Sequence, residues 1–95
     1  MTEIKVAEIV RSTAGHDSGR LYVVVSLSGA YALLADGKTR RLDRPKRKKL
    51  RHLLPEADTP AAVGEHVTRG TVTDSELRSV LAQWKSTVQI EKRRV

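Results

Sequence analysis

The chain has 95 residues, of which 39% are hydrophobic, and this is enough for one small domain. It contains no Cys or Phe, one Trp and two Tyr, so we expect an aliphatic core and exclude disulfides, thiolate metal sites and a cysteine nucleophile. The first ten residues lack the apolar run of a signal peptide, and no stretch approaches the roughly 20 apolar residues of a membrane span. We therefore expect a soluble, cytoplasmic protein.

The net charge of +7 is unevenly distributed along the chain. Residues 1–54 hold twelve Lys or Arg and five Asp or Glu, whereas residues 55–95 hold six of each kind. All of the excess positive charge therefore belongs to the first half. A basic half beside a neutral half favours a polyanionic partner, most often a nucleic acid.

The chain begins with the pattern of short strands separated by loops. Residues 5–11 alternate in polarity, as in a strand that enters a small barrel. The segment "STAGHDSG" (residues 12–19) is polar and holds two glycines, which predicts a loop. The β-branched run over residues 20–27 is too short for a helix and predicts a buried strand.

Two dipeptides, Ser28-Gly29 and Asp36-Gly37, mark the next turns. The first precedes a short strand over residues 30–35. The second is a strong hairpin signal, because both central residues of the favoured turn need a positive φ, and it leads into a strand over residues 38–44. Pro45 ends this strand because it has no N–H to donate.

A last strand is predicted over residues 48–54. Residues 1–54 then form a small antiparallel barrel with turns about every 8 to 12 residues, and closure removes the exposed edges of the sheet. Residues 55–72 contain two Pro and two Gly without a sustained period, which predicts a linker or a loop packed on the barrel.

A helix is predicted over residues 73–89, followed by a frayed tail over residues 90–95. Thr73 and Glu76 form a capping box, in which a hydroxyl and a carboxylate bind N–H groups at the helix start. The helix has one continuous apolar stripe, consisting of Leu77, Val80, Leu81, Trp84 and Val88. We expect Trp84 to hold the helix against the barrel, and the chain to form a single domain.

The segment "RSTAGHDSGRLYVVV" (residues 11–25) consists of an apolar strand, a polar loop, a glycine, a basic residue and a second apolar strand. It resembles the KOW motif, with Gly19 as the characteristic glycine. With "LLADGKTR", the basic run and the terminal helix, the chain is similar to short bacterial KOW-domain RNA-binding proteins and to KOW-containing large-subunit ribosomal proteins of archaea and eukaryotes. The resemblance implies a mainly β fold, a small SH3-like antiparallel β-barrel with a C-terminal α-helix.

The resemblance also implies two RNA-facing segments, the loop of residues 12–19 with its flanking arginines and the basic segment of residues 37–49. Many KOW loops have Lys before the glycine, whereas this chain has Ser18, so we expect the second segment to contribute more of the phosphate binding. The predicted RNA-binding residues are Arg11, Ser12, His16, Asp17, Ser18, Gly19, Arg20, Lys38, Arg40, Arg41, Arg44, Lys46, Arg47, Lys48, Lys49, Arg51 and His52.

The stretch "DRPKRKKLRHL" (residues 43–53) places six Lys or Arg in the eight positions 44–51. A solvated tail and a nuclear localisation signal are the alternatives to a phosphate-binding surface. Leucines interrupt the run and predict an anchored segment, in which Lys49 and Arg51 share one face and Lys48 the other. Preorganised charge binds more tightly than a flexible tail, so we favour phosphate contact.

The glycines and tyrosines each have a structural and a functional interpretation. Gly15 and Gly19 are expected to need a positive φ, and Gly19 also to let a phosphate approach its backbone N–H. Tyr22 and Tyr31 offer faces for base stacking, although we expect at least one of them to fill the core.

Candidate catalytic or metal-binding groups are few. His16 and His52, about 36 residues apart, lack the spacing of known zinc motifs. We expect them to be polar RNA contacts or simply exposed, and Asp17 to cap a turn. No Ser/His/Asp order, paired-carboxylate pattern or glycine-rich phosphate loop occurs. We therefore expect no enzyme, no metal, no cofactor and no small-molecule substrate.

The prediction from the sequence is an RNA-binding protein of the translation machinery. We expect it to bind structured ribosomal RNA as a ribosome-associated or ribosomal protein, with the large subunit favoured and no membrane partner. Two alternatives use the same barrel to bind a protein: an interaction module, and a transcription-elongation accessory that acts on polymerase or DNA.

Overall fold

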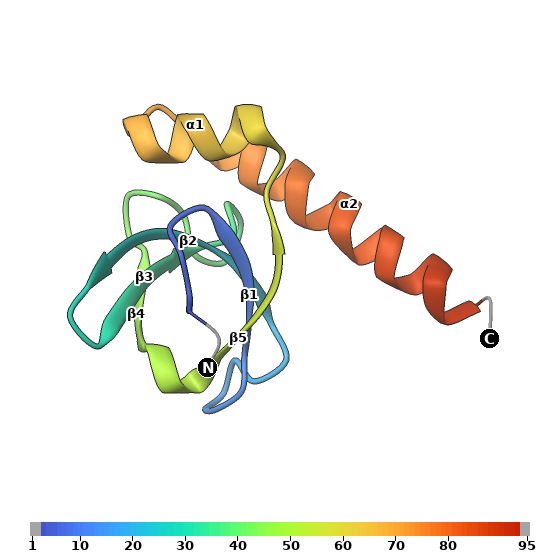
Figure 1. Ribbon diagram of the computed structural model, residues 1–95, viewed down its shortest axis with the longest axis horizontal. Coiled ribbons are helices and arrows are strands. Elements are labelled where there is room, and N and C mark those ends of the chain that lie inside the picture. Colours follow the sequence, from blue (N-terminus) through green and yellow to red (C-terminus); the bar gives the residue numbers. More distant parts are fainter. Residues whose placement is uncertain (1–2, 94–95) are drawn as a thin grey trace.

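The computed structural model describes residues 3–93, and this part of the chain contains five strands and two α-helices (Figure 1). A 3₁₀ turn, η1 (Leu50–His52), joins the last two strands. The other elements are β1 (Glu8–Ser12), β2 (Leu21–Ser28), β3 (Tyr31–Ala35), β4 (Lys46–Lys49), β5 (Leu53–Asp58), α1 (Ala61–Arg69) and α2 (Asp74–Arg93).

The five strands form one antiparallel sheet in the order β4-β3-β2-β1-β5. The sheet curls strongly, but β4 and β5 are its two edges, and no strand ladder joins them within the described residues (Figure 1). The prediction of a small antiparallel β domain with a C-terminal helix is confirmed. Closure of the sheet is not observed. The two helices together contain about as many residues as the five strands.

Both faces of the central strands are buried, which explains the continuous apolar run in β2. Alternate residues of β1 and β2 enter two separate hydrophobic clusters. The cluster inside the curled sheet consists of Val10, Tyr22, Val24, Ala32, Leu34 and Leu53. The cluster between the outer face and the helices consists of Ile9, Leu21, Val23, Ala35, Val67, Leu77, Val80 and Leu81.

The C-terminal helix has the predicted cap, and four of the five residues of the predicted stripe pack in or against the outer cluster: Leu77, Val80, Leu81 and Trp84. The Glu76 N–H donates to the Thr73 hydroxyl (3.2 Å), and the Thr73 N–H donates to the Glu76 carboxylate (3.1 Å). Trp84 packs against the outer cluster, and its Nε1–H donates to Glu56 of β5 (3.1 Å). The first half of α2 therefore lies against the sheet, while its second half projects away from it (Figure 1).

Residues 36–45 form a loop, so the hairpin at Asp36-Gly37 and the strand over residues 38–44 were wrong predictions. Gly37 has a positive φ (+78°), but Asp36 does not. The Asp36 carboxylate instead accepts hydrogen bonds from the N–H groups of Lys38 (2.9 Å) and Arg40 (2.7 Å). This side-chain capping of the backbone competes with strand pairing.

The strand predicted over residues 48–54 is divided between β4, η1 and β5. The Leu50 N–H still bonds to the Ala30 carbonyl (2.9 Å), in register with the β3–β4 pairs, and the chain then turns through η1 before β5 begins at Leu53. Arg51 therefore lies in η1, and it does not share a strand face with Lys49.

The boundaries after residue 54 also differ from the prediction. The sheet continues to Asp58, and the segment predicted as a linker or packed loop contains helix α1. This helix is nine residues long and has no side-chain cap at Pro60, and Gly70 ends it in the left-handed conformation (φ +74°). Helix α2 extends through Arg93, beyond the start of the predicted tail, and residues 94–95 lie outside the described residues.

Candidate nucleic-acid interface

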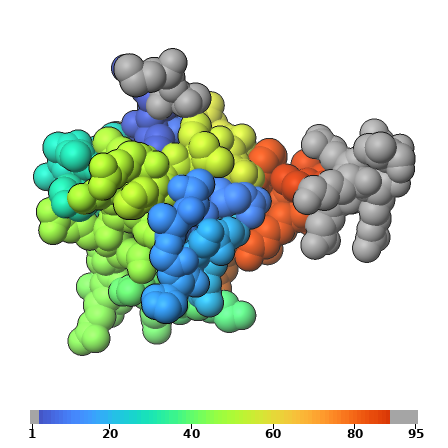
Figure 2. All heavy atoms as spheres, turned by 90° about the horizontal axis from the view of Figure 1, so that it is seen from below, coloured from blue at the N-terminus to red at the C-terminus, as the bar shows by residue number. Residues whose placement is uncertain are grey.

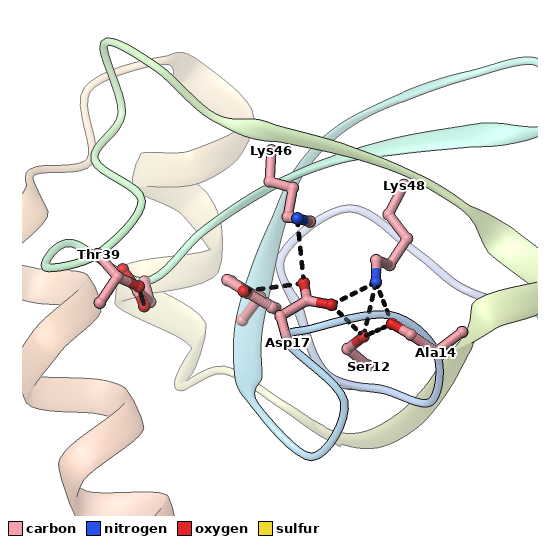
Figure 3. Close-up of polar contacts among 8 residues, drawn as sticks. Ser12, Ala14, Asp17, Thr39, Lys46 and Lys48 are labelled. Atoms are coloured by element: carbon pink, nitrogen blue, oxygen red, sulfur yellow. Dashed lines mark hydrogen bonds and ion pairs between the residues drawn. The ribbon is translucent and has the colours of Figure 1, made fainter.

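The loop between β1 and β2 is tied to β4 by an ionic network centred on Asp17 (Figure 3). The Lys48 Nζ lies 2.5 Å from one carboxylate oxygen of Asp17, and the Lys46 Nζ lies 3.5 Å from the other. The side chains of Asp17 and Lys48 are each 9% exposed. The loop and the basic strand are therefore fixed relative to one another.

Three neutral groups complete the Asp17 network. The hydroxyls of Tyr22 and Ser12 each donate to the carboxylate at 3.0 Å, and the Lys48 ammonium also donates to Ser12 Oγ (2.8 Å) and the Ala14 carbonyl (2.7 Å). Burial favours a higher pKa for Asp17, but the hydrogen bonds from Lys48, Tyr22 and Ser12 outweigh it and hold the pKa well below its ordinary value. Burial and the bond to Asp17 raise the pKa of Tyr22 to about 12.

The network changes the interpretation of three predicted RNA-binding residues. Ser12, Asp17 and Lys48 have buried side chains that bind one another, so they hold the loop in place and do not face a ligand. Lys46 is paired with Asp17 in the same way, although 26% of its side chain remains exposed. The alternation of β4 sends these two lysines toward the loop and Arg47 and Lys49 to the opposite side.

The glycines of the loop have structural roles. Gly15 and Gly19 have φ values of +83° and +90°, as expected. The Gly19 N–H donates to the Ser12 carbonyl at 2.8 Å. It is therefore occupied within the loop, and the prediction that it faces a phosphate is not supported by this geometry. The Gly19 carbonyl accepts from Arg11, whose guanidinium also binds Glu56 (2.9 Å).

Six of the predicted RNA-binding cations between residues 38 and 51 make no ion pair with an acidic side chain of the described residues. Five are exposed and one, Lys49, is half-buried. Arg41 is excluded from this group because it pairs with Asp74 (3.4 Å). We call the group the basic face; it consists of Lys38, Arg40, Arg44, Arg47, Lys49 and Arg51.

The other predicted residues lie around this group. His16, Ser18 and Arg20 are exposed in the β1–β2 loop, and His52 is half-buried at the end of η1, where its carbonyl accepts from the Thr13 N–H (2.9 Å). Figure 2 shows the loop, in blue, directly beside the yellow-green segment that follows the basic strand. The β1–β2 loop thus lies beside β4, whereas Arg47 and Lys49 point to the other side of that strand.

The two tyrosines have different positions. Tyr22 lies in the core, 2% exposed, as we expected for at least one of them. Tyr31 is half-buried on β3, and the Arg47 guanidinium lies 3.8 Å from the centre of its ring. A planar cation stacked on an aromatic ring forms a surface on which a base or a phosphate can rest.

Sequence reasoning missed two cations of α2, Arg78 and Lys85, which are both exposed. They lie seven residues apart, two turns along one helix face, and this spacing was the available signal. Their position relative to the loops depends on how α2 packs on the sheet, which the helical periodicity alone does not specify.

Among the described side chains, no three His, Asp or Glu gather closely enough to bind a metal ion. No helix in the described part of the chain combines the length and the apolar character that crossing a membrane requires. No protein-family model matches the chain, and no curated protein matches its sequence.

Proposed function

We propose that the protein binds structured ribosomal RNA through its basic face, as a ribosome-associated or ribosomal protein of the KOW type. The observation that carries the proposal is the set of six cations without an acidic partner among the described side chains, next to a rigidly held loop. Unpaired cations on an ordered surface bind phosphates without first losing an internal partner.

The strand connectivity supports an SH3-like barrel within this proposal. β1 pairs with both β2 and β5, so the first and last strands are neighbours, and η1 turns the chain between β4 and β5. Side-chain bonds from β4 to the β1–β2 loop hold this edge strand in place. They take the position that a strand ladder has in a closed barrel. A curled five-stranded sheet of this kind presents its loops and edge strand as a binding surface.

Recognition by this surface is dominated by the RNA backbone and by its shape. One aromatic ring, that of Tyr31, lies beside the basic face, and it is already stacked with Arg47. Sequence-specific RNA recognition usually relies on several aromatic side chains that stack on splayed bases. We therefore propose phosphate binding with modest sequence preference, and no catalysis.

Salt dependence tests the basic face. If all six cations neutralise phosphates of a fluorescein-labelled RNA hairpin, the logarithm of the binding constant falls against the logarithm of the salt concentration with a slope of about −5. In the double variant Arg47→Gln/Lys49→Gln, we expect roughly tenfold weaker binding and a slope smaller by about 2. Fluorescence anisotropy at several salt concentrations measures both values.

The matched control is Lys5→Gln/Arg69→Gln, which removes the same charge outside the basic face. Lys5 pairs with Asp58 and Arg69 with Glu65, and all four side chains are more than half exposed, so their loss costs little stability. Equal affinities of the control and the Arg47/Lys49 variant would contradict the assignment of the basic face. Lys46 and Lys48 stay unchanged because they hold the loop.

Sedimentation of a tagged copy through sucrose gradients of cell lysate tests the ribosomal partner. We expect the protein to co-migrate with the large subunit at low salt and to be released at high salt, because phosphate contacts weaken as salt is added. A protein that stays at the top of both gradients would remove stable ribosome binding and leave free RNA as the partner.

A second candidate function is protein binding, which one surface feature favours. A groove of about 340 Å³ lies beside α2, and its apolar lining includes Ile9, Pro60, Val80 and Trp84. Apolar grooves of this kind accept side chains of a protein partner. A complex whose stability does not change with salt would support this function.

A further inference from the structure

A groove with several cationic side chains in its walls lies where the start of β2, the β3–β4 loop and helix α2 meet. It comprises a hollow of about 540 Å³ and an adjoining one of about 290 Å³, which share Leu21, Asp36, Lys38 and Lys85 in their walls. We call it the helix groove. Lys38 also belongs to the basic face, so the helix groove continues that face onto α2.

The charge of the helix groove is strongly positive. Its walls carry five cations, Arg11, Arg20, Lys38, Arg78 and Lys85, and one carboxylate, Asp36. Arg11 is neutralised by Glu56, at 2.9 Å. Arg20, Lys38 and Lys85 form no ion pair with an acidic side chain of the described residues, so their charges are available to a ligand.

The single carboxylate of the helix groove is used to build the loop. Asp36 accepts hydrogen bonds from the N–H groups of Lys38 and Arg40 and from the Thr39 hydroxyl. Although burial acts in the opposite direction, these bonds lower the pKa of Asp36. Its oxygens therefore point into the loop backbone, and they do not pair with the cations of the helix groove.

The walls of the helix groove are fixed against each other. Arg78 of α2 donates to the Gly37 carbonyl (2.7 Å), and the Leu42 N–H donates to Asp74 at the start of α2 (2.8 Å). The β3–β4 loop is thus docked on the helix at two points. A preformed arrangement of cations loses little entropy when it binds an anion.

We infer that the helix groove binds the phosphate backbone of the RNA that the basic face contacts, and that Lys85 is a phosphate-binding residue. The free cations come from three separate elements, so a ligand that meets all of them must carry several negative charges along its length. A nucleic-acid strand has one charge for roughly every 3.4 Å of helix axis, so successive phosphates can meet cations from separate elements. This inference rests on the proposed RNA binding.

The test compares the variant Arg20→Gln/Lys85→Gln with the wild-type protein, with Arg47→Gln/Lys49→Gln and with the control Lys5→Gln/Arg69→Gln. All variants lose the same charge, and the probe is the same fluorescein-labelled RNA hairpin. We expect roughly tenfold weaker binding for the Arg20/Lys85 variant than for the control, and a salt slope smaller by about 2. Arg20 and Lys85 are exposed, so the midpoint of thermal unfolding should stay unchanged.

The possible outcomes separate the two proposals. If the Arg20/Lys85 variant binds the RNA like the control while the Arg47/Lys49 variant binds more weakly, phosphate binding by the helix groove is overturned. The proposal that the basic face binds RNA is then supported. If the Arg20/Lys85 variant alone is weakened, the RNA lies in the helix groove and the assignment of the basic face is overturned. If the wild-type protein shows no salt-dependent binding to RNA, both proposals are overturned.

Discussion

Replacing Asp17 by asparagine is expected to lower the free energy of unfolding by about 3 kcal/mol. The substitution keeps the size of the side chain but removes the charge that balances Lys48, whose side chain is 9% exposed. An ammonium that remains in such a place without its counter-charge is strongly destabilising, because the desolvation cost is no longer offset. Urea denaturation, followed by the fluorescence of the single Trp, measures the difference.

The control for this prediction is Asp43→Asn, which makes the same change at an exposed residue of the β3–β4 loop. We expect an effect within about 0.5 kcal/mol there. A second test combines Asp17→Asn with Lys48→Met. Removing both charges should recover part of the lost stability, since a buried pair replaced by neutral side chains is often tolerated. If Asp17→Asn and Asp43→Asn unfold at the same urea concentration, the network does not stabilise the fold.

The same network predicts a pH dependence. Because the folded state holds the pKa of Asp17 below its unfolded value of about 3.9, its stabilisation is present at neutral pH and is lost as the pH falls from about 4 toward the lower folded pKa. The wild-type protein should therefore lose stability in acid more steeply than the Asp17→Asn variant. Parallel curves for the two proteins would contradict the ionic role of Asp17.

The strands, the loops and the C-terminal helix were predictable where local patterns agree with tertiary packing. The β-branched run of β2 and the capping box and stripe of α2 are such cases. The β3–β4 loop and α1 were not predictable in this way. The dipeptide Asp36-Gly37 is also the signal of a hairpin turn, so the sequence does not show that the Asp36 side chain caps its own loop. Helix α1 is only nine residues long, contains Gly64 and has no side-chain cap at Pro60, so it lacks the local signals of a helix.

The candidate site was predictable in composition but not in the role of each residue. Five of the six cations of the basic face lie within the predicted basic segment of residues 37–49, and Arg51 follows it closely, whereas Lys48, from the same run, is a buried partner of Asp17. Burial of a lysine depends on a carboxylate that lies 31 positions away in the sequence, and neither residue signals the other locally. Lys85 is the opposite case, a residue outside the segment that the packing of α2 brings to the same surface.

Gly37→Ala is expected to lower the free energy of unfolding by about 3 kcal/mol, because two costs add. Gly37 has a φ of +78°, a conformation that costs a residue with a Cβ roughly 1 to 2 kcal/mol. A Cβ at this position would also lie 2.2 Å from the Asp74 carbonyl oxygen and 3.1 Å from Arg78 Cγ. The β3–β4 loop would have to separate from the start of α2.

The matched control is Gly29→Ala in the β2–β3 turn. Gly29 also has a positive φ (+58°), but a Cβ there would meet no atom within 4 Å among the described residues. The Gly29→Ala substitution therefore measures the cost of the backbone conformation alone. We expect it to lower the free energy of unfolding by about 1 kcal/mol in the same urea experiment. A larger loss for Gly37→Ala than for Gly29→Ala then measures the contact between loop and helix. Equal losses would mean that the loop and α2 separate at little cost, so the helix groove would have no fixed walls.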